Sequence, residues 1–118
     1  MDRTVRFQET LRRLAMIDEG FVEDQARIGL AGTSVLDPKT TALLRLGGSV
    51  ALGSPAVCLE WCAGRALAAG ASEDEIADVL LAIVPVAGLG RVVAAAPDVA
   101  IALGYDVAAA LEEPDDYR

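Results

Sequence analysis

Residues 55–87 read PAVCLEWCAGRALAAGASEDEIADVLLAIVPVA and contain two helix patterns separated at Gly70. At the start of the second pattern, Ser72 and Glu75 match a capping box, in which each side chain binds the other residue's terminal amide. Apolar residues then recur at the spacing of a single helix face: Ile76, Val79, Leu80, Ile83, Val84 and Ala87. This regular pattern, with no alternating strand pattern elsewhere, predicts an all-α chain.

Upstream, Asp37 and Ser54 each precede a proline, and this order of cap and proline is typical of a helix start. We therefore expect helices over residues 38–52 and 55–69. The Gly47–Gly48 pair in the first of these helices costs stability, which we interpret as room for a closely packed second backbone.

The remaining helices are expected towards both ends of the chain. Residues 4–28 predict one or two solvated amphipathic helices with a break or bend at Gly20. Residues 89–103 carry an apolar stripe through Pro97, where we expect a break or kink. A short helix is expected over residues 106–112.

Length and composition indicate a single domain. The chain has 118 residues, enough for one hydrophobic core and too few for two. We divide it into an N-terminal helical extension (1–33), a helical domain (34–112) and an acidic tail (113–118). Apolar residues make up 53% and aromatic residues 4%, so aliphatic side chains fill the core. One short chain cannot cover all of this apolar surface, and we expect the remainder to be buried between the subunits of a homo-oligomer.

Charge and hydropathy exclude several classes of protein. The net charge of -8 repels a phosphate backbone, so neither nucleic acid nor an anionic membrane is an expected partner. No uncharged run approaches the roughly 20 residues that span a bilayer, and the charged N-terminus lacks the apolar segment of a signal peptide. We therefore expect a cytoplasmic protein, in which two cysteines are buried thiols or a redox pair.

The stretch from Leu36 to Ala95 resembles the core of the carboxymuconolactone decarboxylase family. Its most specific segments are LDPKT (36–40), CLEWCAGRALAAGASEDEI (58–76) and PVAGLGR (85–91). The resemblance implies an alkylhydroperoxidase-D-like (AhpD-like) helical bundle that assembles into trimers or hexamers. It also implies a pocket near the central helix pair and a subunit interface.

The chain partly resembles the alkylhydroperoxidase-D-like branch of that family. That branch has a Cys-x-x-Cys motif, a histidine four residues after it and a glutamate on the preceding helix. In this chain the two motif cysteines fall on Pro55 and Cys58, the histidine on Cys62 and the glutamate near Ala42. The resemblance implies peroxiredoxin-type (alkyl hydro)peroxidase activity, an antioxidant oxidoreductase function. The decarboxylase branch uses a histidine on this helix, and the chain contains none.

Cys58 and Cys62 share a helix face, with their Cα atoms about 6 Å apart, in the upper part of the disulfide range. Cys58 lies in the first turn, where the helix dipole favours a thiolate, and it is therefore the expected nucleophile. Cys62 would resolve the resulting sulfenic acid as a disulfide that an external thiol reductant reopens. The alternative is that both cysteines are small core residues.

Neighbouring residues of the same helix are candidate substrate contacts. Trp61 either lines a pocket or fills the core or an interface. Glu60 is either a buried base or a surface residue. Arg65, like Arg91 farther along the chain, either holds an anionic substrate or pairs with an acid across a subunit interface.

Neither a cofactor nor a metal is expected, because two thiolates without histidine do not complete the tetrahedral shell of zinc within one chain. The leading hypothesis is a thiol peroxidase that acts on a small-molecule substrate. One alternative is a non-redox oligomer that binds a small organic ligand. The other is a lactone decarboxylase-like enzyme, which needs a general acid that the sequence does not offer.

Overall fold

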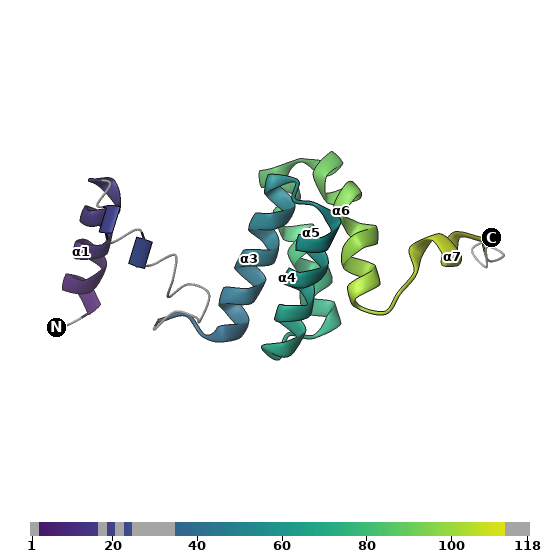
Figure 1. Cartoon of the computed structure of the whole chain (residues 1–118), viewed down its shortest axis with the longest axis horizontal. Coiled ribbons are helices and arrows are strands. Elements are labelled where there is room, and N and C mark those ends of the chain that lie inside the picture. Colours follow the sequence, from purple (N-terminus) through teal and green to yellow (C-terminus); the bar gives the residue numbers. More distant parts are fainter. Residues whose placement is uncertain (1–2, 17–18, 21–22, 25–34, 113–118) are drawn as a thin grey trace. The chain divides into compact units, whose positions relative to one another are not determined.

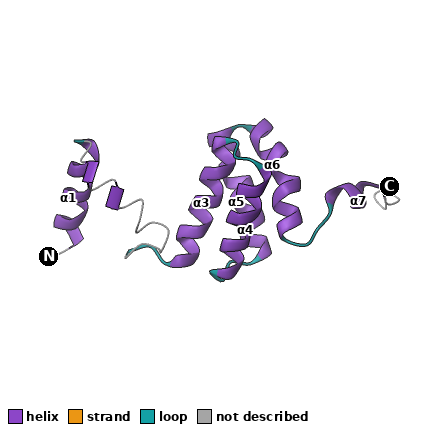
Figure 2. Ribbon diagram, viewed as in Figure 1, coloured by secondary structure: helices purple, strands orange, loops and turns teal. Residues whose placement is uncertain are grey.

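The computed structural model describes residues 3–16, 19–20, 23–24 and 35–112, and every regular element in those residues is helical (Figure 2). Six helices are delimited: α1 (Arg3–Ala15), α3 (Pro38–Leu52), α4 (Ala56–Ala68), α5 (Glu73–Ala87), α6 (Leu89–Ala102) and α7 (Val107–Glu112). The chain divides into two compact units, residues 1–35 and 36–118. Within the described part, no helix is long and apolar enough to cross a bilayer. The prediction of an all-α chain is confirmed.

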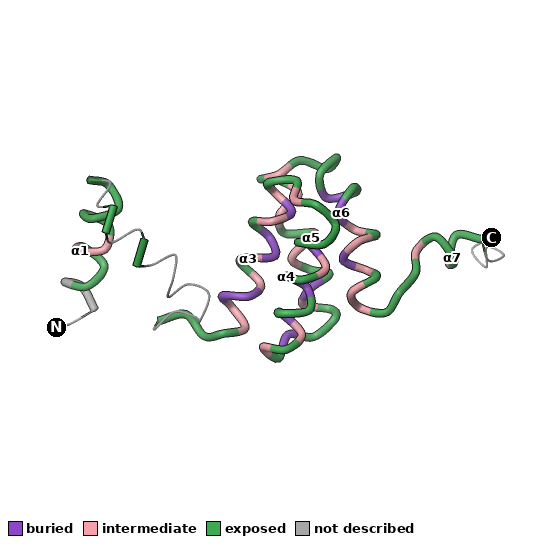
Figure 3. The backbone as a smooth tube through the Cα atoms, in the orientation of Figure 1, coloured by how far each residue is buried: buried purple, intermediate pink, exposed green. Residues whose placement is uncertain are grey.

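Helices α3 to α6 form the core of the second unit (Figure 1). Helix α3 packs on α4 and α5, and α6 packs on the same two helices, while α7 contacts only α6. The largest fully buried side chains are Leu46 and Val50 of α3, Ile76 of α5 and Val99 of α6. Buried residues are accordingly concentrated in α3 to α6 (Figure 3), and small alanines of α4 let the four helices approach closely.

Two of the expected helix starts carry the predicted caps. The Asp37 carboxylate accepts a 2.7 Å hydrogen bond from the amide of Thr40, which lowers the pKa of Asp37 below its ordinary value. Ser72 and Glu75 form the reciprocal capping box, with bonds of 2.9 and 3.0 Å. The pKa of Glu75 is lowered, first by the Ser72 amide and then by Lys39, whose ammonium nitrogen lies 3.0 Å from the Glu75 carboxylate. That ion pair joins the starts of α3 and α5.

The prediction that Ser54 caps the next helix is wrong. Helix α4 starts at Ala56, and its N-cap is Pro55, which supplies no side-chain hydrogen bond. Ser54 instead completes the end of α3, because its amide donates to the carbonyl of Ser49 at 3.1 Å. Gly53 adopts a left-handed conformation with φ of 68° between them, the arrangement that satisfies the last carbonyls of a helix.

Of the break or kink expected near Pro97, the break is wrong, since α6 continues through that residue. Proline removes the amide that would bind the carbonyl four residues earlier, which belongs to Val93. Both residues are exposed, so water can bind that carbonyl and the helix tolerates the loss.

Among the residues that the structure describes, no second backbone packs against the Gly47–Gly48 pair, contrary to the expectation from sequence. A Cβ atom at Gly48 would meet nothing within 4 Å. At Gly47 the nearest atoms belong to the side chains of Val79 and Ile83 on α5. Gly48 therefore lies on an exposed surface of α3, and Gly47 lies in a side-chain contact with α5.

Helix α1 is the amphipathic helix expected in the N-terminal segment. Glu9 pairs with Arg12 at 2.7 Å and with Arg13 at 2.9 Å, and these hydrogen bonds lower its pKa to about 2. Gly20, where a break or bend was expected, is helical together with Glu19, and residues 17–18, 21–22 and 25–34 lie outside the described residues.

The short helix expected at the other end of the chain is present as α7. Asp106 caps its start by accepting a 3.2 Å hydrogen bond from the amide of Ala109. The predicted acidic tail, 113–118, lies outside the described residues.

Candidate functional site

Helix α4 carries both cysteines, one helical turn apart. Because the helix starts at Ala56, Cys58 lies in its first turn, and its side chain is exposed. Cys62 lies in the next turn and is only 8% exposed. The two thiols therefore share a helix face but differ in access, since a molecule in solvent reaches Cys58 far more easily than Cys62.

The thiol of Cys62 is hydrogen-bonded to the neighbouring helix. Ser49 of α3 places its hydroxyl oxygen 3.3 Å from the Cys62 sulfur, and either group can be the donor. Ser49 lies one turn before the end of α3, whereas Cys62 lies in the second turn of α4. Sequence reasoning missed Ser49, because apolar periodicity does not set the register of α3 against α4.

Trp61 and Arg65 extend the exposed face that begins at Cys58. Trp61 follows Cys58 by three residues and is 55% exposed, so it does not fill the core of this unit. The guanidinium carbon of Arg65 lies 5.2 Å from the centroid of the Trp61 ring, which is a cation–π contact. The structure thus brings Cys58, Trp61 and Arg65 together along one side of α4.

Glu60 does not join that group. It is half-buried and lies two residues from Cys58, and residues two apart on a helix do not face each other. A role for Glu60 as a base or as a substrate contact stays a prediction.

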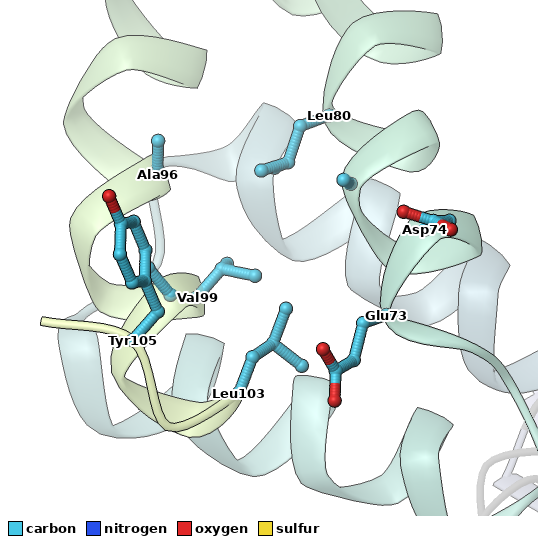
Figure 4. Close-up of a pocket in the computed structure, with 9 residues that line it drawn as sticks. Glu73, Asp74, Leu80, Ala96, Val99, Leu103 and Tyr105 are labelled. Carbon is cyan, nitrogen blue, oxygen red and sulfur yellow. The ribbon is translucent and has the colours of Figure 1, made fainter. Parts of the chain in front are cut away.

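A separate cavity of about 320 Å³ lies between α5 and α6 (Figure 4). Leu80, Val99 and Leu103 supply aliphatic surface, while Tyr105 and Glu73 stand on opposite sides. No residue of α4 lines this cavity, so it is distinct from the thiols.

Metal ligands do not gather in the part of the chain that the structure describes. There, no group of three or more His, Cys, Asp or Glu residues is placed to hold a metal ion. The carboxylates with lowered pKa values belong to α1 or to helix caps, namely Glu9, Asp37 and Glu75.

The carboxymuconolactone decarboxylase family matches residues 24–100, which is more than half of the chain and includes α3, α4 and α5 completely. No curated protein and no solved structure matches the chain. The match extends the resemblance upstream of Leu36 and includes the helix that carries both cysteines.

Proposed function

The chain belongs to the carboxymuconolactone decarboxylase family, and on that premise we propose that it is a thiol-dependent hydroperoxide reductase. The observation that carries the proposal is the unequal exposure of two thiols one turn apart. Cys58 is open to solvent, and Cys62 is buried and bonded to Ser49. An exposed nucleophile next to a protected thiol suits a reaction in which the first thiol is oxidised and the second resolves it.

Cys58 reacts first. Its thiolate attacks the terminal oxygen of an organic hydroperoxide, so that an S–O bond forms while the O–O bond breaks. The alkoxide leaves and takes a proton from solvent to give the alcohol, and Cys58 becomes a sulfenic acid.

Cys62 reacts second. Its sulfur attacks the sulfenic sulfur, the S–S bond forms, and hydroxide leaves as water after gaining the thiol proton. An external dithiol then reduces the disulfide and restores both thiols, becoming a disulfide itself. The sum is the reduction of one hydroperoxide to an alcohol and water by one dithiol.

Resolution requires a local change in α4. Cα atoms about 6 Å apart lie in the upper part of the disulfide range, and Cys62 must also leave Ser49. The first turn of α4 suits such a change because its N-cap, Pro55, adds no side-chain hydrogen bond. We therefore expect resolution to be slower than the attack by Cys58.

Trp61 and Arg65 are the proposed contacts for the organic group of the substrate. They follow Cys58 along the same exposed face, and the Trp61 ring offers an apolar surface beside the guanidinium of Arg65. An alkyl or aryl hydroperoxide can rest on this ring while its peroxide group meets Cys58.

A thiol titration tests the proposal. One equivalent of cumene hydroperoxide is added to the reduced chain, and free thiols are counted by mass spectrometry. The wild type should lose two thiols as a disulfide, and Cys62→Ser should accumulate a sulfenic acid at Cys58 that dimedone traps. Cys58→Ser is the matched control and should not react rapidly. Oxidation at the same slow rate in the wild type and in Cys58→Ser would refute the proposal.

We also propose that this AhpD-like bundle forms a homo-oligomer in the cytoplasm. Large apolar side chains of α3 to α6 are left exposed: Leu44, Leu52, Val57, Leu81, Val86, Leu89 and Val93. Burial between copies would remove them from water. Sedimentation that shows a stable monomer at micromolar concentration would contradict this second proposal.

A further inference from the structure

A groove of about 280 Å³ lies where the turn between α3 and α4 meets α6. Val50 and Leu59 supply apolar surface, and three polar residues, Ser54, Arg91 and Asp98, also line it. Neither cysteine lines the groove. Its volume is near the lower end of the range for ligand sites in proteins, which suits a small molecule.

The polar side chains of the groove have no partner within the described residues. There, Ser54, Arg91 and Asp98 make no side-chain hydrogen bond and no ion pair. Arg91 and Asp98 are seven residues apart on α6, which separates them by about 10 Å along the helix axis. Two opposite charges therefore line one groove at backbone positions two helical turns apart.

Gly53 gives the Arg91 guanidinium its place at the groove. The guanidinium group lies in the space that a side chain at Gly53 would occupy, and a Cβ atom there would overlap Nη1 of Arg91. Arg91 therefore lies against the end of α3 and presents its unpaired donors at the groove.

We propose that this groove binds a small organic carboxylate. Arg91 binds the carboxylate through its forked donors, and the apolar body of the ligand lies on Val50, Leu59 and Ala95. A hydroxyl or amino group at the other end of the ligand donates to Asp98. The net charge of -8 opposes non-specific binding of anions, so the affinity must come from the groove itself.

Titration of the full chain with 4-hydroxybenzoate, followed by amide chemical shifts, tests the proposal. This probe carries a carboxylate and a hydroxyl at opposite ends of an apolar ring. We expect saturable shifts at residues of the groove, and Arg91→Gln should weaken binding roughly 10-fold to 100-fold because it removes charge-assisted bonds. Arg45→Gln is the matched control, since it removes the same charge from α3 outside the groove.

A neutral probe shows how much of the affinity comes from the carboxylate charge and how much from the shape of the ligand. The amide 4-hydroxybenzamide has the same outline and should bind about 10-fold more weakly or worse. The site does not depend on the thiol proposal, so a chain with both cysteines replaced by serine should bind as the wild type does. The proposal is overturned if 4-hydroxybenzoate, benzoate and acetate all fail to shift groove amides at about 10 mM. It is also overturned if Arg91→Gln, shown to be folded by circular dichroism, binds like Arg45→Gln.

Discussion

A substitution at Gly48 tests whether this face of α3 is exposed to solvent. It lies in the helix interior, and a Cβ atom there would meet nothing within 4 Å. Gly48→Ala should therefore increase the free energy of unfolding by about 0.8–1 kcal/mol, which is the difference in helix propensity between glycine and alanine. At Gly47 the new methyl group would lie 3.4 Å from Val79 and 3.6 Å from Ile83, at ordinary contact distance, so Gly47→Ala should also stabilise the chain.

Gly53→Ala is the opposing control. Its φ of 68° costs an L-residue roughly 1–2 kcal/mol, and the new Cβ atom would displace Arg91. Gly53→Ala should therefore unfold at lower urea concentration than the wild type.

Urea unfolding followed by circular dichroism compares the three variants. With a slope of about 1–3 kcal/mol per molar urea, Gly48→Ala should raise the midpoint by roughly 0.3–1 M. Leu44 and Leu52 flank Gly48 on the same face, so the comparison is made at a protein concentration at which the chain sediments as a monomer. A lower midpoint for Gly48→Ala under that condition would refute the reasoning, because it would mean that part of the same chain packs on this face of α3.

Three further predictions concern the core, the buried thiol and α1. Leu46 is fully buried, so Leu46→Ala should cost about 2–5 kcal/mol in urea unfolding, and a loss below about 1 kcal/mol would contradict its place in the core. Ser49→Ala removes the partner of Cys62, so the rate at which iodoacetamide alkylates Cys62 should change, rising if the thiol is the donor and falling if the hydroxyl is, while the rate at Cys58 stays the same; an unchanged rate at Cys62 would count against the hydrogen bond. In an NMR titration, Glu9 should show a midpoint near pH 2. Its pKa is lower in the folded chain than the ordinary 4.5, so its stabilisation of α1 is present above pH 4.5 and is lost as the pH falls through about 2. A midpoint near 4.5 would show that its arginine partners are absent in solution.

The helices could be predicted where a local signal fixed their starts. Asp37 before proline and the Ser72–Glu75 capping box act within one turn, so sequence alone located the starts of α3 and α5. The prediction that Ser54 caps α4 failed because a serine can follow the end of one helix or begin the next. Which of the two occurs here depends on the conformation of Gly53.

The candidate site was only partly predictable, because it depends on how helices pack on one another. The positions of Cys58 and Cys62 on one helix followed from their spacing. The contact between Cys62 and Ser49 depends on the register of α3 against α4, and the place of Arg91 depends on how α6 meets the end of α3. Apolar periodicity says which face of a helix is buried but leaves open which residue of a neighbouring helix it meets.

The burial of Cys62 makes chemical damage at the two sulfur atoms unequal. Irreversible oxidation of Cys58 to a sulfinate would place a charge at an exposed position, and the helices could stay packed. The same lesion at Cys62 would place an anion inside the cluster that contains Leu59 and Ala63, where an unpaired charge is very costly. In the proposed peroxidase, damage at Cys58 would therefore remove the nucleophile from a chain that still folds, whereas damage at Cys62 would unfold the chain.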